Sequence, residues 1–196
     1  MIKRIMLFVF AIFLMIAVPA YAGTQQYVCE NSYIPGGWVI DYVIASSSSC
    51  GGDSRYRIEN MNGSPTGTEE YVCEVSPVPG GWVIDYIIAS SPSSCAGDSR
   101  YRIKNMNGYS TGTEEYVCEV SPIPSGWVID YVIASSPSSC TGDSRYRIEN
   151  MNGSPVGTQK YVCDISPIPN GWAVDYVIAS DSACGGNSRY RIEKQY

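Results

Sequence analysis

The sequence predicts an all-β repeat protein, with four tandem repeats of about 45 residues, each holding about three antiparallel strands and one disulfide. Three observations predict this fold class. Four near-identical segments cover residues 27–70, 71–115, 116–160 and 161–196. Eight cysteines recur at nearly constant spacing within them. Each segment also contains apolar and aromatic runs bounded by Gly, Pro, Asn and Ser, a pattern typical of short strands.

The N-terminal 22 residues have the features of a signal peptide. Lys3 and Arg4 precede an apolar run from Ile5 to Val18, and the segment ends in Ala20-Tyr21-Ala22, an A-x-A cleavage pattern. The apolar core of about 14 residues is short for a membrane span, which needs roughly 20. We therefore expect a secreted or periplasmic protein without a membrane span after signal cleavage. Its mature part, residues 23–196, would be a single repeat array. A retained N-terminal anchor is the alternative.

Composition excludes several classes of function. Without Lys3 and Arg4, the mature chain carries 11 cationic and 19 acidic side chains, a formal net charge of −8. An acidic protein lacks the basic surface that nucleic acids and anionic membranes require. Histidine, the commonest metal ligand and general base, is absent. The sequence predicts no enzyme, no metal site and no cofactor.

Cysteine usage points to an oxidising compartment. The separations within repeats are 21, 22, 22 and 21 residues, and those across repeat boundaries are all 23. We expect pairing within each repeat, because every copy is then complete after duplication: Cys29–Cys50, Cys73–Cys95, Cys118–Cys140 and Cys163–Cys184. The alternative joins Cys50–Cys73, Cys95–Cys118 and Cys140–Cys163 across the boundaries.

Repeat 2 illustrates the expected strands, at residues 82–89, 100–105 and 113–119. The first has apolar residues on both faces, which favours a central strand covered on both sides. Asn107-Gly108 is a strong hairpin signal between the second and third strands. This hairpin predicts a continuous antiparallel meander across the repeat boundaries, with a closed propeller-like or barrel-like ring as the alternative. Repeat 4 ends before this turn, so we expect a truncated terminal cap.

One aspartate lies in the middle of each long strand, at Asp41, Asp85, Asp130 and Asp175. A carboxylate on a covered sheet face needs a partner. We expect a cross-strand ion pair with an arginine of the following strand. An acid–base role would need a second carboxylate nearby. Glu59 offers one in repeat 1, but Lys104 takes its place in repeat 2, which argues against a repeated catalytic pair.

A Gly-Asp-Ser-Arg segment, with Asn for Asp in repeat 4, follows the second cysteine of each repeat. These residues are typical of a tight turn. Their exposed donors and acceptors also suit a sugar hydroxyl or a polar peptide, whereas calcium requires more oxygen ligands than one turn supplies. The candidate ligand-binding residues are therefore Asp53, Arg55, Asp98, Arg100, Asp143, Arg145, Asn187 and Arg189.

Aromatic residues recur on the long strand. We expect core positions for the tryptophans Trp38, Trp82, Trp127 and Trp172 and for the tyrosines Tyr42, Tyr86, Tyr131 and Tyr176, as is usual at strand period. If that face were open, the rings would form a ladder of stacking platforms of the kind that carbohydrate-binding proteins use.

The pattern as a whole favours a secreted, multivalent, lectin-like binding protein. Four near-identical units would strengthen weak binding to a glycan or to an extracellular protein on a cell surface. A structural extracellular or envelope repeat protein without a small ligand is one alternative. A secreted inhibitor or toxin-like factor that uses one exposed loop is another. The sequence leaves the oligomeric state open.

Overall fold

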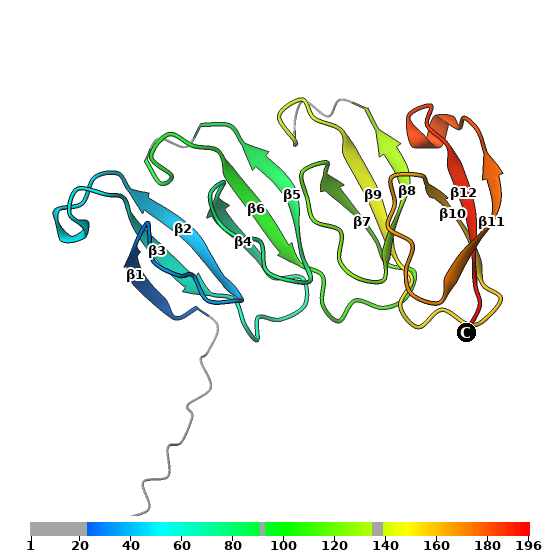
Figure 1. The fold of residues 1–196 in the computed structure, drawn as a ribbon, viewed down its shortest axis with the longest axis horizontal. Helices are drawn as coiled ribbons and strands as arrows, with labels where there is room; N and C mark the ends of the chain where they lie inside the picture. Colours follow the sequence, from blue (N-terminus) through cyan, green and yellow to red (C-terminus); the bar gives the residue numbers. More distant parts are fainter. Residues whose placement is uncertain (1–22, 91–92, 135–138) are drawn as a thin grey trace, which may run out of the picture.

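Four three-stranded sheets stand side by side in an open row in the computed structural model, which describes residues 23–90, 93–134 and 139–196 (Figure 1). The predicted signal peptide lies outside the described residues. The all-β repeat array is confirmed, and the row does not close into a ring. No described residue belongs to a helix that is long and apolar enough to cross a membrane.

Each repeat contributes three strands to its own sheet. Repeat 1 has β1 (Gln25–Cys29), β2 (Trp38–Ile44) and β3 (Arg55–Asn60), and repeat 2 has β4 (Glu69–Cys73), β5 (Trp82–Ile88) and β6 (Arg100–Asn105). Repeat 3 has β7 (Glu114–Cys118), β8 (Trp127–Ile133) and β9 (Arg145–Asn150), and repeat 4 has β10 (Gln159–Cys163), β11 (Trp172–Ile178) and β12 (Arg189–Lys194). Two short 3-10 turns, Ser48–Cys50 and Ser182–Cys184, precede β3 and β12.

The expected meander across repeat boundaries is wrong. Within each sheet the third strand is central, in the orders β1-β3-β2, β4-β6-β5, β7-β9-β8 and β10-β12-β11. Both sides of β6 are thus taken by β4 and β5 of the same repeat, and no side remains for β7. The Asn107-Gly108 segment forms a turn within a longer linker, in which Thr113 N–H donates to the Ser110 carbonyl. Each sheet forms from one repeat unit, but its first strand begins two residues before the predicted repeat boundary, at Glu69 in β4, Glu114 in β7 and Gln159 in β10.

The connection from the first strand to the second crosses the sheet. β1 and β2 are both antiparallel to β3 and hence parallel to each other, so residues 30–37 must return along one sheet face. Ile34 of this crossing segment packs against the buried cluster that contains Ile40 and Ile58. The crossing segment therefore supplies part of the cover for the apolar face of its own sheet.

All eight cysteines form disulfides within repeats, which confirms the expected pairing and rules out the cross-boundary alternative. The bridges of repeats 2, 3 and 4 are fully buried, and that of repeat 1 is partly exposed. Each bridge closes a loop of about 21 residues, which stabilises the fold by about 3 kcal/mol in the chain-entropy model.

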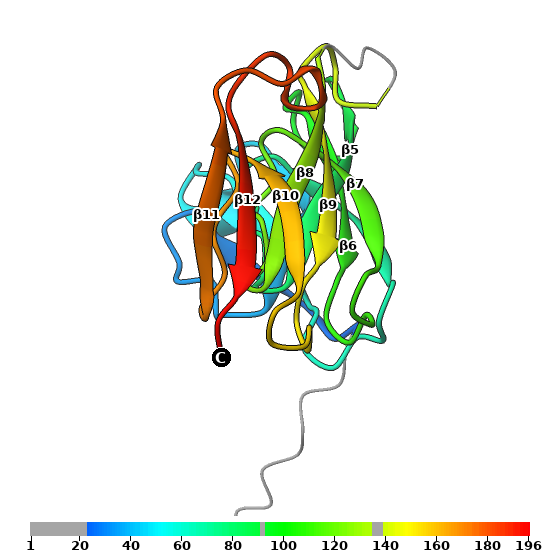
Figure 2. The ribbon, with the colours of Figure 1, turned by 90° about the vertical axis from the view of Figure 1, so that its right-hand side faces the viewer.

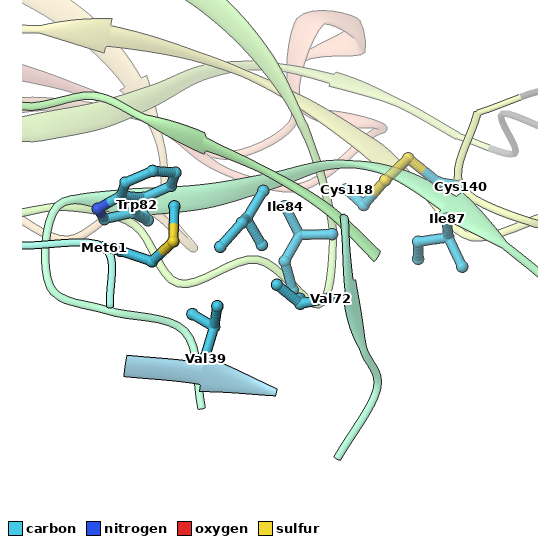
Figure 3. Packing of buried hydrophobic residues seen from close by; sticks show 9 residues of the cluster. Val39, Met61, Val72, Trp82, Ile84, Ile87, Cys118 and Cys140 are labelled. Atoms are coloured by element: carbon cyan, nitrogen blue, oxygen red, sulfur yellow. A yellow bond between two sulfur atoms is a disulfide. The ribbon is translucent and has the colours of Figure 1, made fainter. Parts of the chain in front are cut away.

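The long strand of each repeat (β2, β5, β8 or β11) lies at the edge of its sheet, so the expected central position is wrong. Its second face is nevertheless covered, because the next repeat packs against it. Val39 of β2 is fully buried and lies in one apolar cluster with Val72 and Trp82 of repeat 2 (Figure 3). Ile103 of repeat 2 belongs to the same cluster. Val83 and Val128 occupy the same place at the next two junctions. Apolar residues on both faces thus indicate coverage by a neighbouring repeat as well as by the strand's own sheet.

A β-bulge adapts this edge to the neighbour. The register shifts between Ile40 and Tyr42, so Asp41 is the extra residue, and the same shift occurs in β5, β8 and β11. Beside the bulge, the N–H groups of Ile40, Ile84 and Ile129 each donate at 2.8 Å to a serine of the next repeat, namely Ser76, Ser121 and Ser166. The next repeat therefore supplies acceptors that the edge strand lacks in its own sheet.

Replacing Val83 with alanine should lower the free energy of unfolding by about 2 kcal/mol, because two buried methyl groups leave a cavity at the junction. Urea unfolding followed by tryptophan fluorescence measures the change. Val174→Ala, on the exposed part of β11, is the matched control and should change stability by under about 0.5 kcal/mol. Equal effects of the two substitutions would contradict the role of Val83 as a junction residue.

Candidate functional site

Polar side chains gather at the two opposite ends of the sheets. One end holds the turns that join the second strand of each repeat to the third, and these include the predicted Gly-Asp-Ser-Arg residues. The other end holds the Asn-Met-Asn-Gly linkers between repeats (Figure 1). Because each feature recurs in successive repeats, either end presents a row of similar groups along the array.

The predicted turns form tight, internally bonded structures. The backbone N–H groups of Asp53, Asp98, Asp143 and Asn187 all donate to the carbonyl of the preceding half-cystine in the same repeat. The four side chains are exposed, and Asp53 accepts a hydrogen bond from Asn31 at 3.3 Å. The turn interpretation is confirmed, and ligand binding by these residues stays a prediction.

The arginines of these segments lie over tyrosine rings. Arg55, Arg100, Arg145 and Arg189 place the guanidinium carbon 4.4, 4.9, 4.9 and 5.1 Å from the ring centroids of Tyr27, Tyr71, Tyr116 and Tyr161, respectively. Such cation–π contacts contribute about 0.5–1 kcal/mol at exposed sites. The arginines of the third strand therefore contact the tyrosines of the first strand and help to hold the two strands together.

The expected aspartate–arginine pairs are confirmed in all four repeats. Asp41, Asp85, Asp130 and Asp175 receive two-pronged hydrogen bonds from Arg57, Arg102, Arg147 and Arg191, with closest distances of 2.6 to 2.8 Å. At Asp130, burial opposes ionisation, but hydrogen bonds from Arg147 and Lys160 outweigh it and hold the pKa below its usual value. These pairs satisfy the carboxylate of the bulge residue.

The aromatic residues of the long strand divide between two environments. Trp82, Trp127 and Trp172 are buried, so the core interpretation is confirmed for these three tryptophans, while Trp38, in the first described repeat, is partly buried. The tyrosines are not core residues. The bulge turns Tyr42 and its counterparts toward the arginine face, where Arg57 lies 5.5 Å from the Tyr42 ring. No stacking ladder of open tryptophan faces results.

Three hollows lie at corresponding positions at the linker end of the described residues, one at each junction between repeats. Their volumes are about 350, 310 and 270 Å³ from the first junction to the third. We call them junction hollows. Each is lined by the methionine, asparagine and glycine of one linker and by the Pro-x-Gly-Trp segment of the next repeat; for the first hollow these are Met61, Asn62, Gly63, Pro79, Gly80 and Trp82.

Asparagine amides form the polar walls of the first two hollows. Asn105 is buried and fully engaged, since it donates to the Ser64 and Pro65 carbonyls and accepts from Asn107. Asn62 and Asn107 are exposed. Their Oδ1 atoms accept no hydrogen bond from any described residue, although their amide nitrogens donate within their own linkers. The hollows thus combine free amide acceptors with the edge of a buried tryptophan.

The third hollow departs from this pattern. Lys194 stands where the first two hollows have Asn105 and Asn150, and its ammonium group donates to the Asn170 carbonyl at 3.3 Å. The third hollow is therefore cationic, whereas the linings of the first two are uncharged.

Sequence reasoning missed the junction hollows. Asn-Met-Asn-Gly and Pro-x-Gly-Trp lie more than 20 residues apart within repeats 1, 2 and 3, and their convergence across a boundary depends on stacking that the pattern does not reveal. A usable signal was the repetition of both motifs in three successive repeats. Asn-Gly is also typical of a turn, and the sequence alone does not distinguish a turn from a lining role.

Beside the bulge aspartates, a charged residue of one repeat faces a charged residue of the next repeat at each junction. We call these residues the charged seam. At the second junction Lys104 of β6 pairs with Glu115 of β7 at 2.5 Å, and at the third Lys160 of β10 contacts both Glu149 and Asp130. At the first junction the corresponding residues, Glu59 and Glu70, are both acidic. Burial, with added repulsion from Glu59 and Asp41, raises the pKa of Glu70. The junctions are alike in shape and different in charge.

One group of carboxylates has the spacing that a metal ion would need. Oxygens of Glu114, Asp130 and Glu149 lie within 4.8 Å of one another. The ammonium group of Lys160 lies 3.0 Å from Asp130 and also contacts Glu149. A lysine thus supplies the positive charge that these carboxylates require, and the group is explained as part of the seam.

Comparisons with known protein families, with curated proteins and with solved structures find no match to this chain. The chemistry of the repeated surfaces is therefore the basis for the function proposed below.

Glu70→Lys should stabilise the protein by about 1 kcal/mol at pH 7, because it reproduces the Lys160 arrangement beside two carboxylates. Glu70→Gln removes only the repulsion and should stabilise less. Urea unfolding at several pH values measures both effects.

The pH dependence follows from the raised pKa of Glu70 in the folded state. Ionised Glu70 destabilises the fold at neutral pH, and this penalty disappears as the pH falls through the folded pKa toward about 4.3, the usual glutamate value. The advantage of Glu70→Gln over the wild type should shrink over the same range. An advantage that is independent of pH would show that charge repulsion is not its cause.

Proposed function

We propose that the protein is a multivalent binding protein whose junction hollows each take one small, uncharged, hydroxyl-rich unit, such as a sugar residue of a larger glycan. The observation that carries the proposal is the recurrence of one hollow, lined by residues at equivalent positions, at successive junctions. Volumes of about 310 and 350 Å³ lie at the lower end of the range for small-molecule sites, roughly 300–1,000 Å³.

The lining chemistry supports a neutral polar ligand. Asn62 and Asn107 offer amide oxygens as acceptors for hydroxyl groups, and the indole edges of Trp82 and Trp127 provide apolar contact. The described residues of these two hollows include no ionisable side chain apart from the phenol of Tyr109, so nothing in them favours an anion or a cation. The lysine in the third hollow would give that site a different preference.

Multivalency compensates for weak single sites. A hollow of this size and exposure holds one unit weakly, but a second hollow on the same rigid array meets its unit at high effective concentration. Affinity for a clustered or polymeric glycan should then exceed affinity for one soluble unit by a factor of about 100 or more. Binding at the Gly-Asp-Ser-Arg turns is the competing location for the same function.

Blocking substitutions test the proposal at one backbone position in successive repeats. Gly80 lines the first hollow and Ser125 the second, and serine or asparagine is already present at this position in repeats 3 and 4. We expect Gly80→Tyr with Ser125→Tyr to abolish retention on an array of immobilised glycans. Gly36→Tyr is the matched control, since Gly36 is exposed, a side chain added there would meet nothing within 4 Å, and Gly36 lines none of the three junction hollows. The Gly36 carbonyl accepts a hydrogen bond from Asn62 at 3.3 Å, and the substitution keeps that carbonyl.

Two further outcomes would decide against the proposal. Wild-type protein that binds no neutral glycan on the array contradicts it. Binding that survives both blocking substitutions but is lost in Asp98→Ala with Asp143→Ala would move the site to the predicted turns. Thermal unfolding of every variant confirms that the changes in binding do not come from unfolding.

A further inference from the structure

The row of sheets ends in two unlike faces that match the two sides of an internal junction. We call the outer side of β11 in repeat 4 the trailing face, and the outer side of β1 with the crossing segment of repeat 1 the leading face. Figure 2 views the array from the end of repeat 4, with β10, β11 and β12 toward the viewer. At each internal junction, the trailing side of one repeat meets the leading side of the next.

The trailing face exposes the outer edge of β11, whereas the next repeat covers the equivalent strand edge at each internal junction. β11 has the same bulge as β2, β5 and β8, between Val174 and Tyr176. Val174, Tyr176 and Val177 are 43, 54 and 54% exposed, whereas Ile40 and Val43 at the first junction are 1 and 9% exposed. At internal junctions the equivalent N–H groups bind the next repeat, as Ile40 N–H binds Ser76 and Val43 N–H binds the Ser94 carbonyl, both at 2.8 Å.

The leading face keeps the complementary groups. Ser32 stands where Ser76, Ser121 and Ser166 accept the edge N–H, and it is exposed. Trp38, Val28 and the Cys29–Cys50 bridge are partly exposed, although their equivalents in later repeats are buried. Both halves of the recurring junction are thus present, one at each end of the chain.

The polar and charged residues of the two faces are also compatible with a contact between the trailing face of one copy and the leading face of another. In the internal seam the residue before the first-strand tyrosine faces the glutamate or lysine of the preceding third strand, as Glu115 faces Lys104. In repeat 1 this residue is Gln26, and the third strand of repeat 4 carries Glu193. A glutamine amide can donate to a carboxylate, so this pairing avoids the repulsion present between Glu59 and Glu70.

We propose that copies of this chain associate head to tail, with the trailing face of repeat 4 on the leading face of the next copy's repeat 1. The contact joins two different surfaces, and its repetition continues the row of sheets, so the assemblies grow as open chains. The proposal does not depend on any ligand.

Two residues make this contact weaker than an internal junction. Ala173 replaces the buried valine of the trailing side, and Gln195 replaces the buried methionine that packs on the next tryptophan, as Met61 packs on Trp82. The backbone edge remains, so we expect reversible association at high protein concentration.

Analytical ultracentrifugation of residues 23–196, which contain every described strand, tests the proposal over a wide range of concentrations. The average mass of the wild type should rise with concentration. Ala173→Val with Gln195→Met should lower the concentration for half association by about tenfold or more, because apolar groups return to the contact. Wild-type and double-variant proteins that both stay monomeric up to the solubility limit would overturn the proposal.

Blocking each face separately tests its head-to-tail nature, with both blocks placed in the Ala173→Val, Gln195→Met background. Val177→Lys blocks the trailing face and Ser32→Arg the leading face, and both positions are exposed, so folding should persist. Each blocked chain alone should be monomeric, and an equal mixture should form dimers and nothing larger. Association of either blocked chain by itself would show that another surface is responsible.

Discussion

The structure depends on the need of each edge strand for hydrogen-bond partners. A three-stranded sheet leaves backbone N–H groups free along its outer strands, and an open edge favours pairing with other chains. Here the bulge at Asp41 and its equivalents breaks the regular edge, and a serine of the following repeat accepts the N–H beside it. The apolar contacts of Val39 and the ion pair of Asp41 are built around this edge. Repeats 1, 2 and 3 are therefore each completed by the repeat that follows.

The candidate site is a product of the same junction. A single repeat contains Trp82 and Gly80 but lacks the linker of the repeat before it, and the hollow exists only where the two meet. The proposed binding thus depends on stacking, and four repeats yield three hollows. Differences in the charged seam show that the sequence of one junction can change without altering this geometry. Lys194 shows that the lining of a single hollow can also change independently.

The sequence predicted what is local to one repeat. Cysteine spacing led to the disulfides, strand period to the three strands, and the lone Asp41 to its pairing with an arginine. It failed where a pattern had two physical origins. Apolar residues on both faces of Trp82–Ile88 indicated a central strand, but a neighbouring repeat covers an edge strand equally well. Asn107-Gly108 suited a hairpin, but β6 had no free side for the partner strand. The hollows were missed because they join segments of different repeats.

Closure of both the sheet and the disulfide within one repeat bears on the order in which the cysteines of a growing chain can pair. A chain that emerges N-terminus first delivers Cys29, Cys50 and all of β1 to β3 before Cys73 appears. Eight cysteines released together allow on the order of 100 pairings. Stepwise release presents them two at a time, and each pair can be oxidised within a finished sheet before the next arrives. The order of strands and cysteines along the chain thereby favours the four native disulfides over other pairings.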